Sequence, residues 1–128
     1  MTENDYADSN IDQFLLDQID TIPHLEALLL LWNSRPKKWS LEDMAQALFV
    51  ATDAAKEILD DLARRDLIVS GAFGNYHYET SPQRDQLVAD VDSTYRKELI
   101  RVSLLIHSKP SSAVREFARA FRLKKDRE

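Results

Sequence analysis

The sequence predicts a mainly α-helical domain with one small two-stranded antiparallel β-hairpin and long C-terminal helices. Two observations predict this class. Apolar residues recur at spacings of three and four through most of the chain, the period that places side chains on one side of a helix. Near the middle of the chain, two short β-prone runs flank a glycine-containing turn, which is the pattern of a hairpin.

Four helices are expected before the hairpin. They follow an acidic segment, residues 1–10, that has little to bury and is expected to be disordered. The first helix carries an apolar stripe between Ile11 and Ile22. The second begins at Pro23, whose missing N–H suits a first helical turn, and runs to Ser34. It is apolar on most sides, so we expect it at the centre of the core.

The third and fourth helices are shorter. Ser40 is expected to cap the third, and Phe49–Ala51 forms a break before the fourth, which ends near Arg65. Their buried faces are expected to hold Leu41, Met44, Ala45, Leu48, Ala55, Ile58, Leu59 and Leu62.

The hairpin and a long helix follow. The strands are expected at 67–69 and 76–80, across the turn Gly71–Asn75. From Pro82 to about His107 there is no further Gly or Pro, and the spacing predicts one continuous helix roughly 40 Å long. A domain of this size does not need such a helix to cover itself, so we expect a homodimer through residues 82–107. A last helix is expected to run to about Leu123.

Composition restricts the class of protein. The 128 residues suit one domain, and the absence of cysteine excludes disulfides, a thiolate zinc site and a thiol nucleophile. Two glycines are too few for a glycine-rich phosphate loop. The longest apolar run, 27–32, is far shorter than the roughly 20 residues that cross a bilayer. The N-terminus is acidic where a secretory signal would be basic, so we expect a cytoplasmic protein.

The segment from Ser40 to Ile68, SLEDMAQALFVATDAAKEILDDLARRDLI, resembles the helix-turn-helix of winged-helix proteins, with MarR-like bacterial regulators nearest. About half of the chain carries the resemblance. Its strongest parts are the buried spacing and the ending Leu62–Ile68, which leads directly into the hairpin. The resemblance implies a winged-helix domain over residues 11–81. Residues 82–128 would be a helical extension, packed into the same domain and contributing to a dimer.

The resemblance also places a DNA-facing surface on the second helix of the motif and on the hairpin, or wing. The corresponding helix residues are Thr52, Asp53, Ala54, Lys56 and Glu57, and the wing residues are Phe73, Asn75, Tyr76 and Tyr78. The charges do not favour DNA binding by this helix, because its single lysine stands among four carboxylates and the wing tip has no Lys or Arg. Two residues depart from the family's pattern: Phe49 replaces a small turn residue, and Asp66 stands where glycine is frequent.

Basic residues lie elsewhere, mainly at the C-terminal end. Residues 95–128 have ten Lys or Arg and four Asp or Glu, although the formal net charge of the whole chain is −5. The predicted last helix has a basic tail, Arg115, Arg119, Arg122, Lys124 and Lys125, beside an apolar stripe, Val114, Phe117, Ala118 and Phe121. Such a helix binds phosphates, an anionic membrane surface or an acidic protein. Alternatively, it packs its apolar side on the core and leaves the arginines in solvent. A smaller group, Arg35, Lys37 and Lys38, lies beside Trp39 before the motif.

No catalytic, cofactor-binding or metal site is predicted, and the chain is not expected to be an enzyme. The three histidines, His24, His77 and His107, are far apart in sequence and none has a partner at ligand spacing. The first functional hypothesis is a winged-helix protein of transcription regulation with weak or partner-dependent DNA binding. The alternatives are a winged-helix module that binds proteins instead of DNA, and a simple dimerisation unit.

Overall fold

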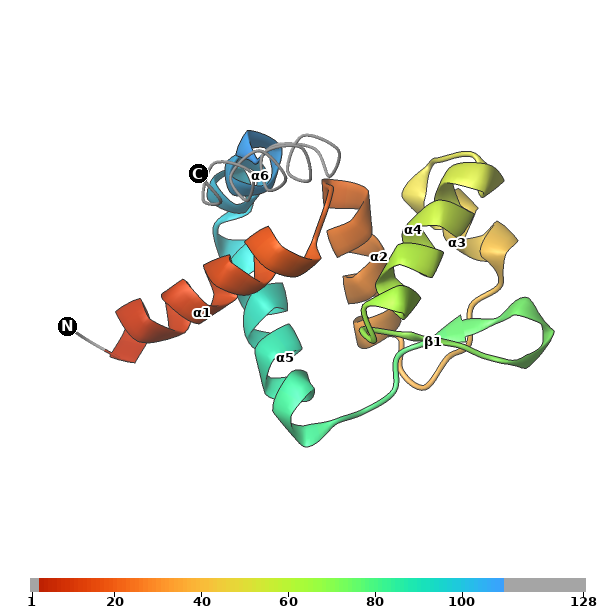
Figure 1. The fold of residues 1–128 in the computed structure, drawn as a ribbon, viewed down its shortest axis with the longest axis horizontal. Coiled ribbons are helices and arrows are strands. Elements are labelled where there is room, and N and C mark those ends of the chain that lie inside the picture. Colours follow the sequence, from red (N-terminus) through yellow and green to blue (C-terminus); the bar gives the residue numbers. More distant parts are fainter. Residues whose placement is uncertain (1–2, 110–128) are drawn as a thin grey trace, which may run out of the picture.

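The computed structural model describes residues 3–109, which contain six α-helices, one short 3-10 helix and a two-stranded sheet (Figure 1). The helices are α1 (Glu3–Gln18), α2 (Ile22–Asn33), α3 (Leu41–Leu48), α4 (Thr52–Arg64), α5 (Pro82–Lys97) and α6 (Leu99–Ser108). The antiparallel strands β1 (Val69–Ser70) and β2 (Tyr76–His77) are joined through the 3-10 helix η1 (Ala72–Gly74). This confirms the predicted class, mainly α with a small hairpin.

Helix α2 lies at the centre of the molecule, as its composition predicted. Figure 1 shows α3, α4 and the hairpin on one side of α2, and α1, α5 and α6 on the other. Leu25, Leu28 and Leu31 of α2 are completely buried. Because both groups of elements bury their apolar faces against α2, the described chain has one continuous core.

The helix-turn-helix forms from local signals that the sequence displays. The Ser40 hydroxyl accepts a hydrogen bond from the Asp43 N–H at 3.1 Å, so the predicted cap of α3 is confirmed. Phe49 ends α3 in the left-handed region, with φ 57°, and thereby separates α3 from α4. Asp66 takes a similar conformation after α4, with φ 60°, at the position where the resembled family often has glycine.

The hairpin is also bonded to a third segment, which no sequence pattern indicates. Val69 pairs with His77 and Ser70 with Tyr76. In addition, Trp39 exchanges two backbone hydrogen bonds with Tyr76, at 2.7 and 2.8 Å. The connection between α2 and α3 is therefore fixed against the wing.

The N-terminal segment differs from its prediction. Helix α1 begins at Glu3, so residues 3–10 are helical and not the disordered segment expected from their acidity. Extending a helix by further residues costs little free energy once a helical turn exists. The predicted stripe is confirmed at Ile11, Phe14 and Leu15 of α1 and at Ile19 just after it, all of which are buried. Ile22, the predicted end of the stripe, instead begins α2 and is half-buried.

The long helix predicted over 82–107 is wrong, because it breaks at Glu98 (φ −127°, ψ 50°) into α5 and α6. The two helices run in different directions in Figure 1. The change of direction lets α6 pack on α1 and bury Val102 and Ile106 there. Burying two aliphatic side chains stabilises the fold by more than the helix would gain from keeping this one turn unbroken. No helix among the described residues combines the length and apolar character needed to span a membrane.

Candidate nucleic-acid interface

Helix α4 presents one apolar and one polar face. Ala55, Ile58, Leu59 and Leu62 are buried against the core. The predicted surface residues Thr52, Asp53, Lys56 and Glu57 are all exposed, and Ala54 is half-buried. The helix is therefore oriented as the second helix of a helix-turn-helix, with its N-terminal residues facing solvent.

The outer face of α4 is acidic once its internal pairs are taken into account. Lys56 binds Asp60 at 2.6 Å, and Arg64 binds Asp61. The hydrogen bond from Lys56 lowers the pKa of Asp60, with a further contribution from the Tyr76 hydroxyl, so Asp60 stays ionised. Asp53 and Glu57 form no ion pair with any described residue. The charges left free on this face are consequently negative.

A shallow hollow follows this face of α4. It is open to solvent and lined by Asp53, Lys56, Glu57, Asp60, Asp61 and Arg64. A phosphate group entering it would meet four carboxylates and two cations that are already paired. Coulomb repulsion and desolvation both oppose that contact.

The wing surface is smaller than predicted. Phe73 is fully exposed (100 %) at its tip, and Asn75 is half-buried. Tyr76 and Tyr78, which were expected on the surface, are only 6 % and 4 % exposed. Tyr76 belongs to β2 and Tyr78 follows directly after that strand, and both side chains pack inward.

Both buried tyrosines place their hydroxyls on carboxylates. The Tyr76 hydroxyl donates to Asp60 of α4 at 3.0 Å, and the Tyr78 hydroxyl donates to Asp85 of α5 at 2.7 Å. Burial raises the pKa of Tyr78, and the bond to Asp85 raises it further. The tyrosines therefore join the wing to the helices and offer no surface to a partner.

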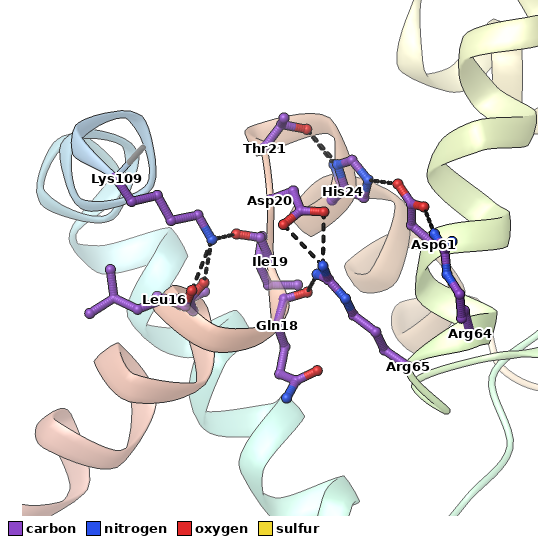
Figure 2. Close-up of polar contacts among 11 residues, drawn as sticks. Leu16, Gln18, Ile19, Asp20, Thr21, His24, Asp61, Arg64, Arg65 and Lys109 are labelled. Atoms are coloured by element: carbon purple, nitrogen blue, oxygen red, sulfur yellow. Dashed lines mark hydrogen bonds and ion pairs between the residues drawn. The ribbon is translucent and has the colours of Figure 1, made fainter. Parts of the chain in front are cut away.

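A polar cluster joins α4 to the turn between α1 and α2 (Figure 2). Nε2 of the buried His24 lies 2.9 Å from Asp61 of α4, and Nδ1 lies 2.6 Å from the Thr21 hydroxyl. Arg65, the residue that follows α4, binds Asp20 at 3.1 Å and also donates to the carbonyl of Gln18. The two ends of this contact are up to 47 residues apart in sequence, so no local pattern could have predicted it.

Asp20, His24 and Asp61 have the residue types of a metal site. Their ligand atoms lie within 4.8 Å of one another, a spacing that a metal ion could draw together. However, each carboxylate already faces a guanidinium group, and both ring nitrogens of His24 have partners. The cluster is balanced in charge and hydrogen bonding without an ion, so its arrangement fits a structural link better than a metal centre.

The same turn receives a third cation, from the end of α6. The Lys109 ammonium donates to the carbonyls of Leu15 and Leu16, both at 3.1 Å, and to that of Ile19 (Figure 2). These carbonyls belong to the last turn of α1 and the residue after it, where backbone acceptors lack helical partners. The basic tail, Arg115, Arg119, Arg122, Lys124 and Lys125, lies outside the described residues.

Comparison with known proteins identifies the fold. No protein-family profile matches the sequence, and no curated protein matches it. Among solved structures, the chain is similar to a MarR family protein from Bacillus stearothermophilus, with a TM-score of 0.53 and 13 % identity over 97 % of this chain and 86 % of that one. It is similar to MarR from Listeria monocytogenes, with a TM-score of 0.52 and 15 % identity over 96 % and 86 %. It is also similar to a mutant of Staphylococcus aureus MepR bound to an oligodeoxyribonucleotide, with a TM-score of 0.51 and 22 % identity over 95 % of this chain and 88 % of that one.

The helix-turn-helix followed by a hairpin makes this chain a winged-helix protein. Within that class, the similarity over almost the whole chain identifies the fold of MarR family regulators, as the segment 40–68 predicted.

Proposed function

We propose that the chain is a winged-helix transcription regulator whose own DNA binding is weak or depends on a partner. Its fold is similar to that of MarR family regulators, and one similar protein is bound to an oligodeoxyribonucleotide. The outer face of α4 limits the affinity for DNA. Asp53 and Glu57 are exposed there, and neither forms an ion pair with a described residue. Most DNA affinity comes from neutralised phosphates, and these two side chains oppose it.

A binding titration tests this proposal. The full-length chain is titrated against mixed duplex genomic fragments at about 50 mM and about 200 mM salt. We expect weak binding at the lower salt that is lost at the higher one. Absence of binding at every salt concentration would refute DNA binding by the chain alone. Tight, sequence-specific binding that persists at 200 mM salt would refute the proposed weakness.

We also propose a homodimer that uses residues 82–107. Three large aliphatic side chains of α6 are exposed: Leu99 by 52 %, Ile100 by 75 % and Leu104 by 63 %. Adjacent exposed aliphatic residues on one helix are typical of a contact surface. Burying them against a second copy would remove apolar area from water at roughly 25 cal/mol per Å².

The substitution pair Ile100→Glu and Leu104→Glu is expected to shift the chain from dimer to monomer, because each places a charge in the proposed contact. Light scattering at micromolar concentration measures the mass. Gln46→Glu, at an exposed position of α3, is the matched control and should leave the dimer intact. A wild-type chain that is already monomeric would contradict the proposal.

In the alternative function, binding of a protein partner, the available aromatic surface is smaller than the sequence predicted. With Tyr76 and Tyr78 buried, the exposed aromatic residues near the motif are Phe49 at the turn after α3 and Phe73 at the wing tip, exposed by 94 % and 100 %. Both have positive φ, a conformation that is costly for a bulky residue. Substitution of Phe73 is therefore the informative test of a protein partner at the wing.

A further inference from the structure

The basic side chains of the described residues differ in whether a carboxylate pairs with them. Lys56, Arg64, Arg65, Arg96 and Arg101 form ion pairs with carboxylates. Arg35, Lys37 and Lys38 form none with any described residue, although they follow one another within the connection between α2 and α3. All three are exposed. This connection is therefore a concentrated patch of unpaired positive charge on a chain whose net charge is negative.

Aromatic rings hold two of these cations in place. The Arg35 guanidinium lies 3.4 Å from the centre of the Trp32 ring and donates to the Trp32 carbonyl at 2.6 Å. The Lys37 ammonium lies 4.1 Å from the centre of the Trp39 ring, whose Nε1 donates to the Ser34 hydroxyl. Cation–π contacts leave the outer N–H groups of both side chains free to donate. Restricted cations lose less conformational entropy when they bind an anion.

A fourth cation stands beside the patch. Arg84 and Arg35 lie 5.7 and 6.0 Å from the Tyr78 ring. The carboxylate that both act on is Asp85, which already accepts hydrogen bonds from the Ser81 N–H and the Tyr78 hydroxyl. Asp85 is thus a shared neighbour and not an exclusive partner for either arginine.

The patch lies on the winged-helix side of the molecule. Trp39 pairs with Tyr76 of β2, and the Tyr76 hydroxyl binds Asp60 of α4. Figure 1 shows the connection between α2 and α3 passing beside the hairpin. The surface around the motif therefore combines an acidic helix, an uncharged wing tip and a basic connection at the base of the wing.

We propose that Arg35, Lys37 and Lys38 bind the phosphate backbone of duplex DNA, so that the α2–α3 connection supplies the affinity that α4 does not. This inference rests on the proposed function and names the residues behind it. Arginine and lysine are the side chains that bind phosphates most strongly. Backbone contacts position a protein on DNA without reading its sequence, so binding through this patch is independent of sequence.

The test compares Lys37→Gln/Lys38→Gln with the wild type, both as full-length chains. Binding to mixed duplex DNA is measured over a range of salt concentrations. The slope of log K against log salt concentration should become shallower by about two units, one for each lost phosphate contact. The loss of affinity should be the same for DNA fragments of different sequence. Lys97→Gln, an exposed residue at the end of α5, is the matched control and should leave the slope unchanged.

The possible outcomes separate this inference from the proposed function. If the wild type binds no DNA at any salt concentration, both are wrong. If the wild type binds and the double variant keeps the same slope, only the phosphate patch is wrong. Binding to vesicles of anionic phospholipid that depends on Lys37 and Lys38, without binding to DNA, would assign the patch to a membrane surface and overturn the inference.

Discussion

Replacing Tyr78 by alanine is expected to lower the free energy of unfolding by about 3–5 kcal/mol, the range for removal of a large aromatic side chain from a core. Tyr78 is 4 % exposed, and its ring meets that of Trp32 edge to face at 5.2 Å. The substitution leaves a cavity between the wing and α2 and removes the hydrogen bond to Asp85. Denaturant unfolding should show a lower midpoint with an unchanged slope.

Phe73→Ala is the matched control, since it removes a ring from the same hairpin. Phe73 is fully exposed, so its loss should change the free energy of unfolding by no more than about 0.5 kcal/mol. Equal effects of the two substitutions would contradict the burial of Tyr78. The difference in burial between the two residues also determines which variant tests a protein partner at the wing. Loss of partner binding in Phe73→Ala would show that the partner contacts the wing surface, whereas loss in Tyr78→Ala would reflect unfolding.

The double substitution Asp53→Lys/Glu57→Lys is expected to raise DNA affinity by on the order of tenfold per new phosphate contact at about 0.1 M salt. Both residues are exposed on α4, and neither is ion-paired by a described residue. The change replaces two repulsive charges with two that release counterions from DNA. The dependence on salt should become steeper by up to about two units, measured by the same titration.

The change in net charge could by itself raise the affinity for DNA, so the control variant must change the net charge by the same amount at positions outside α4. Asp17→Lys/Asp90→Lys alters the net charge equally, at positions on α1 and α5. If α4 faces the DNA, the control should have a much smaller effect than the α4 variant. Equal gains in both variants would show that α4 does not face the DNA.

The helices were largely predictable because their signals are local. Ala55, Ile58, Leu59 and Leu62 recur at helical spacing, and the structure buries all four. Ser40 caps α3 through a contact with Asp43, only three residues away. The placement of Thr52, Asp53, Lys56 and Glu57 on the outer face of α4 follows from the same period.

Features that depend on distant contacts were not predictable in this way. The pairing of Trp39 with Tyr76 joins segments 37 residues apart, and nothing in the loop around Pro36 indicates a strand. The break at Glu98 has no Gly or Pro to mark it, since it arises from the packing of α6 on α1. The burial of Tyr76 and Tyr78 had a signal in the sequence, because residues two apart on the strand predicted at 76–80 would share a face.

The arrangement around the end of α1 has a mechanical consequence. Backbone oxygens within residues 15–19 accept bonds from Arg65 at the end of α4 and from Lys109 after α6. Moving α6 away from α1 would remove the Lys109 ammonium from the carbonyls of Leu15, Leu16 and Ile19. Those carbonyls would then lack a donor beside the Gln18 carbonyl that binds Arg65. The ends of helices α4 and α6 are thus both hydrogen-bonded to the same turn at the end of α1. A large displacement of either helix would therefore disturb the contacts of the other.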